Sequence, residues 1–199
     1  MTTCSKRLVP FLVLAAAWLP GFGQGPAMTP SNVDASVLAK ANSGDAAAQV
    51  QVGDSISGAA SASGLEARKL VESYKSAAAW YRKAADLGSV DGELRLAAVY
   101  RDGKGVERDM VQAAAWYRKA AEQGNVGAQA TLGVLYSMGQ GVPKSEVEAF
   151  FWLDLAASVK GPNQEKYAAN RQMIGTHITA DELSDVQDRV AKWQSEHPR

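Results

Sequence analysis

The side chains best able to bind a ligand in this sequence lie in a nine-residue segment, AAAWYRKAA, which occurs twice without a difference at residues 77–85 and 113–121. Its tryptophan and tyrosine could stack on a ligand, and its arginine and lysine could bind an anion. An unvaried duplication at a fixed spacing is, however, more typical of a repeated structural unit. Whether this segment is a site or a framework therefore decides whether the protein is an enzyme.

Other residue types that support catalysis or metal binding occur singly. His177 and His197 are the only histidines, and neither has a partner at metal-ligand spacing. Ser55 lacks a nucleophile-elbow pattern or a nearby base. The glycines at 103–105 and 139–141 lack the full Walker pattern and instead predict helix ends with positive φ. We therefore predict no catalytic residues, no metal site, no cofactor and no enzymatic activity.

The composition of the chain predicts one helical domain. It has 199 residues, enough for a single substantial core, and its 21 basic residues balance its 21 acidic ones. Such a balance disfavours binding to nucleic acid. Alanine-rich, proline-poor segments favour helices over strands.

The amino terminus resembles a secretory signal peptide. Lys6 and Arg7 precede an apolar stretch at 8–19, and small residues at 21–23 offer a cleavage point. Twelve apolar residues are too few for a membrane anchor, since about 20 are needed to span a bilayer. We predict a signal peptide over 1–23, with cleavage after residue 27 as the alternative, and no stable membrane insertion afterwards.

Export would leave the protein without a thiol. The single cysteine, Cys4, lies within the predicted signal, so disulfides cannot stabilise the mature chain. We expect residues 24–31 to form a flexible leader. The predicted location is the periplasm or the cell exterior.

The duplicated segment belongs to a longer repeat. Residues 77–92 and 113–128 match at 11 of 16 positions with an offset of 36, and a degraded third copy places Trp152 another 36 residues beyond Trp116. An earlier unit fits if eight extra residues are allowed, which fall in the polar segment 57–75. Within that segment we expect residues 61–64 to form a loop.

Each unit predicts two amphipathic helices joined by a glycine-containing turn. Apolar residues recur at spacings of three and four along the second helix, which gives one packed stripe. Gly88 and Gly124 fit left-handed helix ends. The predicted N-caps are Ser89, Asp109, Asn125 and Ser145. One helix pair cannot bury its stripe alone, so the pairs must stack into an α-solenoid.

The repeated pattern is similar to the Sel1-like repeat, a relative of the tetratricopeptide repeat. The residues that carry the resemblance are Ala128, Leu132, Gly133, Tyr136, Gly139, Gly141 and Val142, with Ala113, Trp116, Tyr117, Lys119, Ala120, Ala121 and Gly124. The resemblance implies an all-α, right-handed solenoid that mediates protein–protein interaction. The chain departs from the pattern at Ala97, at Ile56, and at Leu153, which replaces a tyrosine.

The resulting division of the chain has capping elements at both ends. After the leader we expect a partial repeat over 32–44, repeats over 45–88, 89–124 and 125–160, and capping helices over 161–199. The final capping helix should begin with a capping box formed by Thr179 and Glu182. One face of that helix should be apolar, through Leu183, Val186, Val190 and Trp193.

Recognition is expected where the repeats differ. Trp80, Trp116 and Trp152 occupy one repeated position, which favours packing between repeats over ligand contact. Equivalent positions on the first helices vary instead, and if these helices line the concave face they could contact a partner. The predicted partner-binding residues are Gln51, Asp54, Arg95 and Thr131. For each of them, solvated helix surface is the simpler alternative.

Two functions from different classes are consistent with the sequence. The leading hypothesis is an exported solenoid that binds an unidentified protein or peptide on its concave face. The alternative is a cell-wall-directed hydrolase or β-lactam-binding protein, because secreted relatives have been connected with such activities. That alternative needs a nucleophile and a base converging in a pocket, and the sequence offers no such set.

Overall fold

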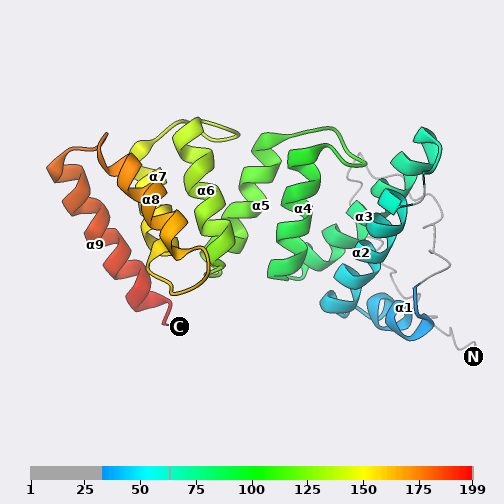
Figure 1. Cartoon of the computed structure of the whole chain (residues 1–199). Helices are drawn as coiled ribbons and strands as arrows, with labels where there is room; N and C mark the ends of the chain where they lie inside the picture. The colour runs from blue at the N-terminus through cyan, green and yellow to red at the C-terminus, as the bar shows by residue number, and fades with distance from the viewer. Residues whose placement is uncertain (1–32, 63, 199) are drawn as a thin grey trace, which may run out of the picture.

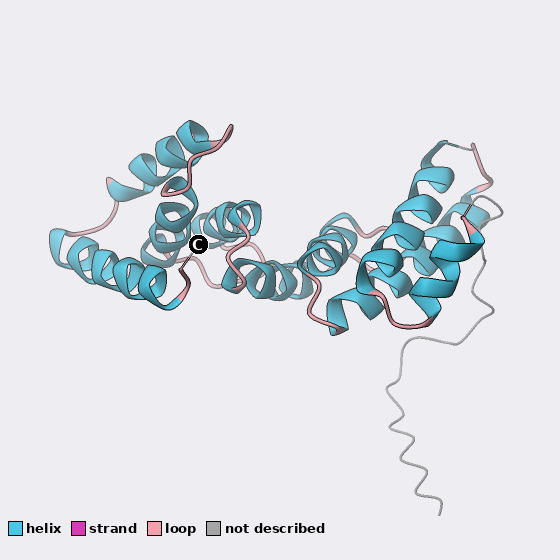
Figure 2. Cartoon of the chain, turned by 90° about the horizontal axis from the view of Figure 1, so that it is seen from below, coloured by secondary structure: helices cyan, strands magenta, loops and turns pink. Residues whose placement is uncertain are grey.

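The computed structural model describes residues 33–62 and 64–198, and all regular secondary structure in them is helical (Figure 2). The helices are α1 (Ala35–Asn42), α2 (Ala46–Ala62), α3 (Ala67–Asp86), α4 (Val90–Asp102), α5 (Met110–Glu122), α6 (Val126–Met138), α7 (Glu146–Ala157), α8 (Gln164–Gly175) and α9 (Ala180–Glu196). Among these helices, none is both long and apolar enough to cross a membrane. The predicted signal peptide and leader lie outside the described residues.

The helices stack in chain order. Each of α1 to α7 packs on the helix that follows it, so the series extends from α1 at one end of the molecule to α9 at the other (Figure 1). Helix pairs α2–α3, α4–α5 and α6–α7 form the three repeated units. This arrangement confirms the predicted α-solenoid, in which each unit contacts mainly its neighbours.

Short polar side chains fix where the helices begin. The Asp109 carboxylate accepts hydrogen bonds from two backbone N–H groups at 2.9 and 3.0 Å, which satisfies donors that the first turn of α5 cannot pair internally. Ser89, Asn125 and Ser145 cap α4, α6 and α7 in the same way. The four predicted N-caps are confirmed, and Thr179 with Glu182 forms the predicted capping box of α9.

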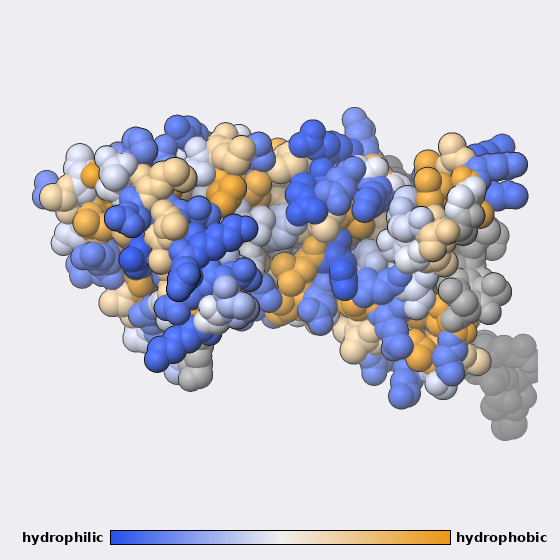
Figure 3. All heavy atoms as spheres, in the orientation of Figure 1, coloured by the Kyte–Doolittle hydropathy of each residue, from blue (hydrophilic) through white to orange (hydrophobic). Residues whose placement is uncertain are grey.

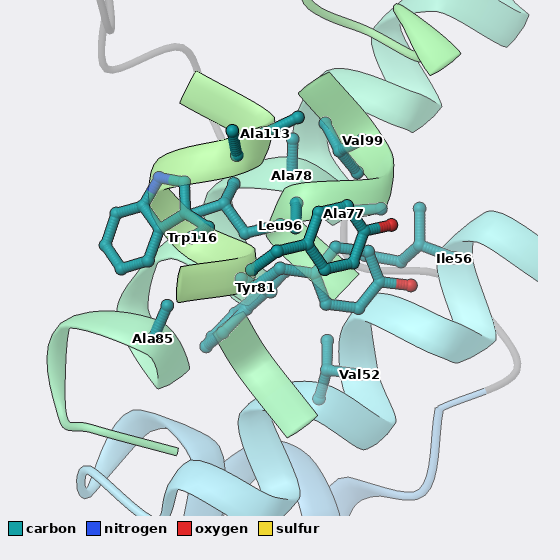
Figure 4. Close-up of a cluster of buried hydrophobic side chains, with 14 of the residues drawn as sticks. Val52, Ile56, Ala77, Ala78, Tyr81, Ala85, Leu96, Val99, Ala113 and Trp116 are labelled. Atoms are coloured by element: carbon teal, nitrogen blue, oxygen red, sulfur yellow. The ribbon is translucent and has the colours of Figure 1, made fainter. Parts of the chain in front are cut away.

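The duplicated segment builds the core. Trp80 and Trp116 are each only 5% exposed, and they pack with the alanines of their own helices and with first-helix residues such as Leu96 (Figure 4). Arg82 of α3 donates to the Tyr100 hydroxyl of α4 at 2.5 Å, and Arg118 of α5 donates in the same way to Tyr136 of α6. The segment is therefore a framework that joins each unit to the next.

Close backbone approach explains the second glycine of each GxGV turn. Gly141 has φ +72°, and a Cβ there would collide with the carbonyl group of Met110 at the start of α5. Gly105, with φ +76°, meets the backbone of Tyr74 and Lys75 in α3 in the same manner. Only glycine combines this φ with this contact. These turns hold each unit against the second helix of the unit before it.

The eight extra residues of the first unit lengthen its two helices rather than forming a long loop. Helix α2 has 17 residues and α3 has 20, whereas α4, α5 and α6 have 13 each. Our expectation of a loop over 61–64 was wrong for Ser61 and Ala62, which are helical. The Ser61 and Tyr74 hydroxyls lie 2.9 Å apart, so a contact between the two helices supports the extension.

The last two helices do not form a pair like the others. Both α8 and α9 pack on α7, through Ile174 from α8 and through Val186 and Val190 from α9. An ion pair of 2.7 Å between Arg189 and Glu148 also joins α9 to α7. The two capping helices thus close the core of the third unit from two sides.

Candidate interaction surface

The four predicted partner-binding residues all lie on first helices. Gln51 and Asp54 belong to α2, Arg95 to α4 and Thr131 to α6. Gln51 and Arg95 are exposed, and the other two are partly buried. Of these first helices, α2 and α4 are in direct contact with each other. The lower edge of the molecule is indented between its two ends (Figure 3).

Asp54 and Arg95 are brought together across two units. The Arg95 guanidinium donates to one carboxylate oxygen of Asp54 at 2.9 Å, and the buried Tyr81 hydroxyl donates to the other at 2.8 Å. Burial raises the pKa of Tyr81, and the hydrogen bond to Asp54 raises it further. Since about half of the Arg95 side chain is exposed, the ion pair itself adds little stability. Both charged groups therefore already have partners within the chain.

Thr131 and Gln51 make contacts within their own helices. The Thr131 hydroxyl donates to the Gly127 backbone carbonyl at 2.8 Å, and the Ser55 hydroxyl donates to the backbone carbonyl of Gln51 at 2.9 Å. These bonds follow helical spacing and orient no ligand. The structure thus joins two of the four predicted residues and leaves the other two as ordinary surface positions of α2 and α6.

The character of the surface changes from the first unit to the third. The position of Asp54 becomes Ala98 and then Val134, while that of Tyr81 becomes Tyr117 and then Leu153. In the middle unit the Tyr117 hydroxyl accepts from Arg101 at 3.0 Å. In the third unit both positions are aliphatic. A polar network therefore gives way to aliphatic packing along the stack.

An apolar pocket of about 240 Å³ lies where the polar network is lost. Val134 and Leu153 line it together with Ser137, Met138, Asn170, Met173 and Ile174, which places it between α6, α7 and α8. The Met138 and Met173 residues are 59% and 60% exposed, which is unusual for large apolar side chains. Flexible methionines suit a surface that adapts to an apolar partner group.

The sequence analysis did not predict this pocket, and only two of its residues gave an indirect signal. Leu153 is a departure from the repeat pattern, and Val134 is equivalent in the repeat to the predicted residue Asp54. Nothing in the sequence places α8 over α6, so Met173 and Asn170 could not be assigned to the same pocket as Val134. The repeat pattern ends before α8 begins.

A second and wider hollow, of about 860 Å³, lies at the carboxyl end. It is lined by residues of α7, α8 and α9, including Phe150, Leu183 and Gln187. Asp154 and Arg171 face it as an ion pair of 2.5 Å. This hollow follows from the separate packing of α8 and α9 on α7, and Glu165 lines it in addition to the neutralised Asp154–Arg171 pair.

The candidate catalytic and metal-binding residues make only local contacts. His177 approaches the Met173 carbonyl at 3.1 Å, and His197 stacks on Trp193 with the ring centroids 4.2 Å apart. Across residues 33–62 and 64–198, no three His, Cys, Asp or Glu side chains are grouped so as to hold a metal ion.

Stacked helix pairs with caps, buried tryptophans and close-approach glycines at repeated positions define an α-solenoid repeat protein. The model of the Sel1 repeat matches residues 46–89, 90–125 and 126–158, which is more than half of the chain. The chain belongs to the Sel1 repeat family, as its sequence pattern predicted. A search of curated proteins found no match.

Two solved structures illustrate the likeness. The protein c5321, described as a protective antigen present in uropathogenic Escherichia coli strains with an SLR fold, is 33% identical with a TM-score of 0.66. That alignment covers 81% of this chain but 32% of c5321, so the chain spans about a third of its relative. A Sel1 repeat protein from Oxalobacter formigenes is 30% identical, with a TM-score of 0.55, and the alignment covers 67% of this chain and 96% of that one.

Proposed function

We propose that this protein is an exported, non-enzymatic scaffold that binds a protein or peptide partner along the first helices of its repeats. Sel1 repeats mediate protein–protein interaction in general, and the fold is one that presents an extended surface. The observation that carries the proposal is the change from the Asp54–Arg95 network to the apolar pocket beside Val134. A surface with a polar end and an apolar end can fix both the position and the direction of a bound segment.

The apolar pocket supplies the anchor in this proposal. Its volume of about 240 Å³ is below the roughly 300–1,000 Å³ of typical small-molecule sites, and it suits one large side chain of a partner. Burying such a side chain is worth about 1.5–3 kcal/mol. At the other end, polar groups of the partner would form hydrogen bonds with the Asp54–Arg95 pair and with Gln51. Thr131 would border the path on α6, close to the pocket.

Binding is tested with lysine substitutions at the exposed methionines. Partner capture by the purified chain should fall at least tenfold in the Met138→Lys and Met173→Lys variants, because a charge at the pocket rim must be desolvated. Val111→Lys is the matched control, since Val111 is an equally exposed apolar residue of a second helix. Equal capture by all variants would contradict the placement of the site.

Export is tested separately by the mass of the mature protein. Cleavage of the predicted signal removes 23 residues, or 27 at the alternative point, and the product should be recovered outside the cytoplasm. Full-length protein in the cytoplasmic fraction would contradict export without affecting the proposed binding surface.

A further inference from the structure

One buried carboxylate interrupts a column of glutamines. Gln49, Glu93 and Gln129 occupy the same position in the first helices of the three units, and they are 4%, 3% and 0% exposed. A buried charge is costly unless it is paired, so the exception in the middle unit requires an explanation.

The glutamines of this column close the end of the preceding helix. The Gln49 amide donates to the Ala41 carbonyl of α1 at 3.0 Å, and the Gln129 amide donates to the Ala121 carbonyl of α5 at 3.2 Å. Ala85 of α3 is the equivalent residue before Glu93. An ionised carboxylate has no proton to donate to that carbonyl. It also faces the negative end of the α3 dipole.

In the middle unit, a hydrogen-bond donor on the opposite side of Glu93 compensates for its carboxylate. The Gln123 amide, at the end of α5, donates to Glu93 at 2.9 Å. The equivalent residues of the other units are Leu87 and Val159, so a donor is present only where the column carries a carboxylate. Because the Gln123 donor and the Glu93 carboxylate occur in the same unit, the structure accommodates the ionised form of Glu93.

Three helices pack against the helix that carries Glu93. From α5, Lys119 favours its charged form and Glu122 opposes it. The only charged residue of α2 is Asp54, which is paired with Arg95. On the α3 side Gly92 lies in direct contact with Ala84 and Ala85, which keeps the helix end close to Glu93. Burial is the largest influence, and it raises the pKa of Glu93.

We infer that Glu93 is a proton-operated latch at the junction of α3, α4 and α5. As a carboxylate it only accepts, from Gln123. After it takes up one proton it can donate to the Ala85 carbonyl while still accepting from Gln123, as a glutamine would. The junction between the first and second units then contains the hydrogen bond to the end of the preceding helix that Gln49 and Gln129 make without a change of protonation.

The sign of the pH dependence follows from the raised pKa. A carboxyl whose pKa is higher in the fold than in the unfolded chain stabilises the fold at pH values below its usual pKa. That stabilisation is lost as the pH rises through the raised value. Acidification from neutral pH should therefore strengthen this junction, whereas the paired carboxylate of Asp102, whose pKa is lowered, acts in the opposite direction.

Thermal unfolding of the Glu93→Gln variant tests the latch. At pH 7 the variant should unfold at a temperature about 2–4 °C higher than the natural chain, because its amide makes the missing bond permanently. The difference should shrink toward zero as the pH falls and Glu93 becomes protonated. A Glu93→Gln variant that is no more stable at pH 7, or whose difference is the same at pH 7 and at pH 4, below the usual glutamate pKa of about 4.3, would overturn the inference.

A matched variant and a direct titration complete the test. Gln129→Glu places the same carboxylate in the third unit, without a Gln123 equivalent, and should lower the unfolding temperature at pH 7 with recovery in acid. In the natural chain, the carboxyl resonance of Glu93 should titrate at a pH above the ordinary glutamate value of about 4.3. Titration at that ordinary value would overturn the inference even if Gln129→Glu failed to fold.

Discussion

The first and third units fill equivalent positions with opposite chemistry. At the first, Tyr81 and Arg95 converge on Asp54, so polar groups are satisfied by one another across neighbouring units. At the third, Leu153 and Val134 line an apolar pocket beside exposed methionines. The same helix geometry therefore supports two kinds of surface. A repeat fold separates the residues that hold the stack together from those that give each unit its own surface.

Removal of the leucine in the third unit should have the largest effect. Leu153 is 1% exposed and packs against Gly133. Leu153→Ala should lower the free energy of unfolding by about 3 kcal/mol, since it leaves a cavity in the core. The matched change Tyr117→Phe, in the middle unit, removes only the bond from Arg101 and should cost about 1 kcal/mol. Unfolding in urea measures the free energy of unfolding of both variants. Equal losses in the two variants would contradict the contrast between the third and middle units.

Removal of the shared acceptor in the first unit should have a smaller effect. Asp54→Ala leaves the buried Tyr81 hydroxyl without its charged acceptor, and we expect a loss of about 2 kcal/mol. Arg95→Ala should cost less than about 1 kcal/mol, because the Arg95 side chain is 54% exposed and its ion pair is screened by solvent. An equal loss in the two variants would show that the ion pair, rather than the tyrosine bond, dominates this network.

The smallest effect concerns alkaline pH. Burial raises the pKa of both Tyr81 and Tyr117, and the carboxylate of Asp54 adds to the shift only at Tyr81. These tyrosines stabilise the fold below the usual phenol pKa of about 10, and that contribution is lost as the pH rises through their raised values. Phenolate absorbance should show Tyr81 ionising at a higher pH than Tyr117. Asp54→Asn should bring its titration closer to that of Tyr117, and an unchanged titration would exclude the proposed role of Asp54.

The sequence predicted the framework well because its causes are local. Helix caps such as Asp109 depend on residues two or three positions away, and the tryptophans repeat at a fixed offset. The predicted stacking of helix pairs follows from alanine stripes that a single pair cannot bury. These features can be derived from one stretch of chain at a time.

The candidate surface could be predicted only in part. Gln51, Asp54, Arg95 and Thr131 were selected as variable positions, yet the pairing of Asp54 with Arg95 joins residues 41 positions apart in neighbouring helices. That contact depends on how the units are rotated against each other, which no local pattern specifies. The pocket beside Val134 was missed for the same reason, since α8 lies beyond the last repeat.

Our misreading of residues 61–62 has a different physical origin. Small polar residues weaken a helix in isolation and favour turns. Here the opposite helix supports them, through the contact between Ser61 and Tyr74. Tertiary packing therefore overrides local preference at the end of α2.

The lengthened α2–α3 hairpin has a consequence for how the molecule could be altered. Residues added at its turn extend both helices along their own axes and leave the positions of Trp80 and Gly105 in the stack unchanged. The turn between the hairpin's helices is therefore a graft point. A reporter peptide or a tether to a solid support could be inserted there while the spacing of the repeats stays as it is.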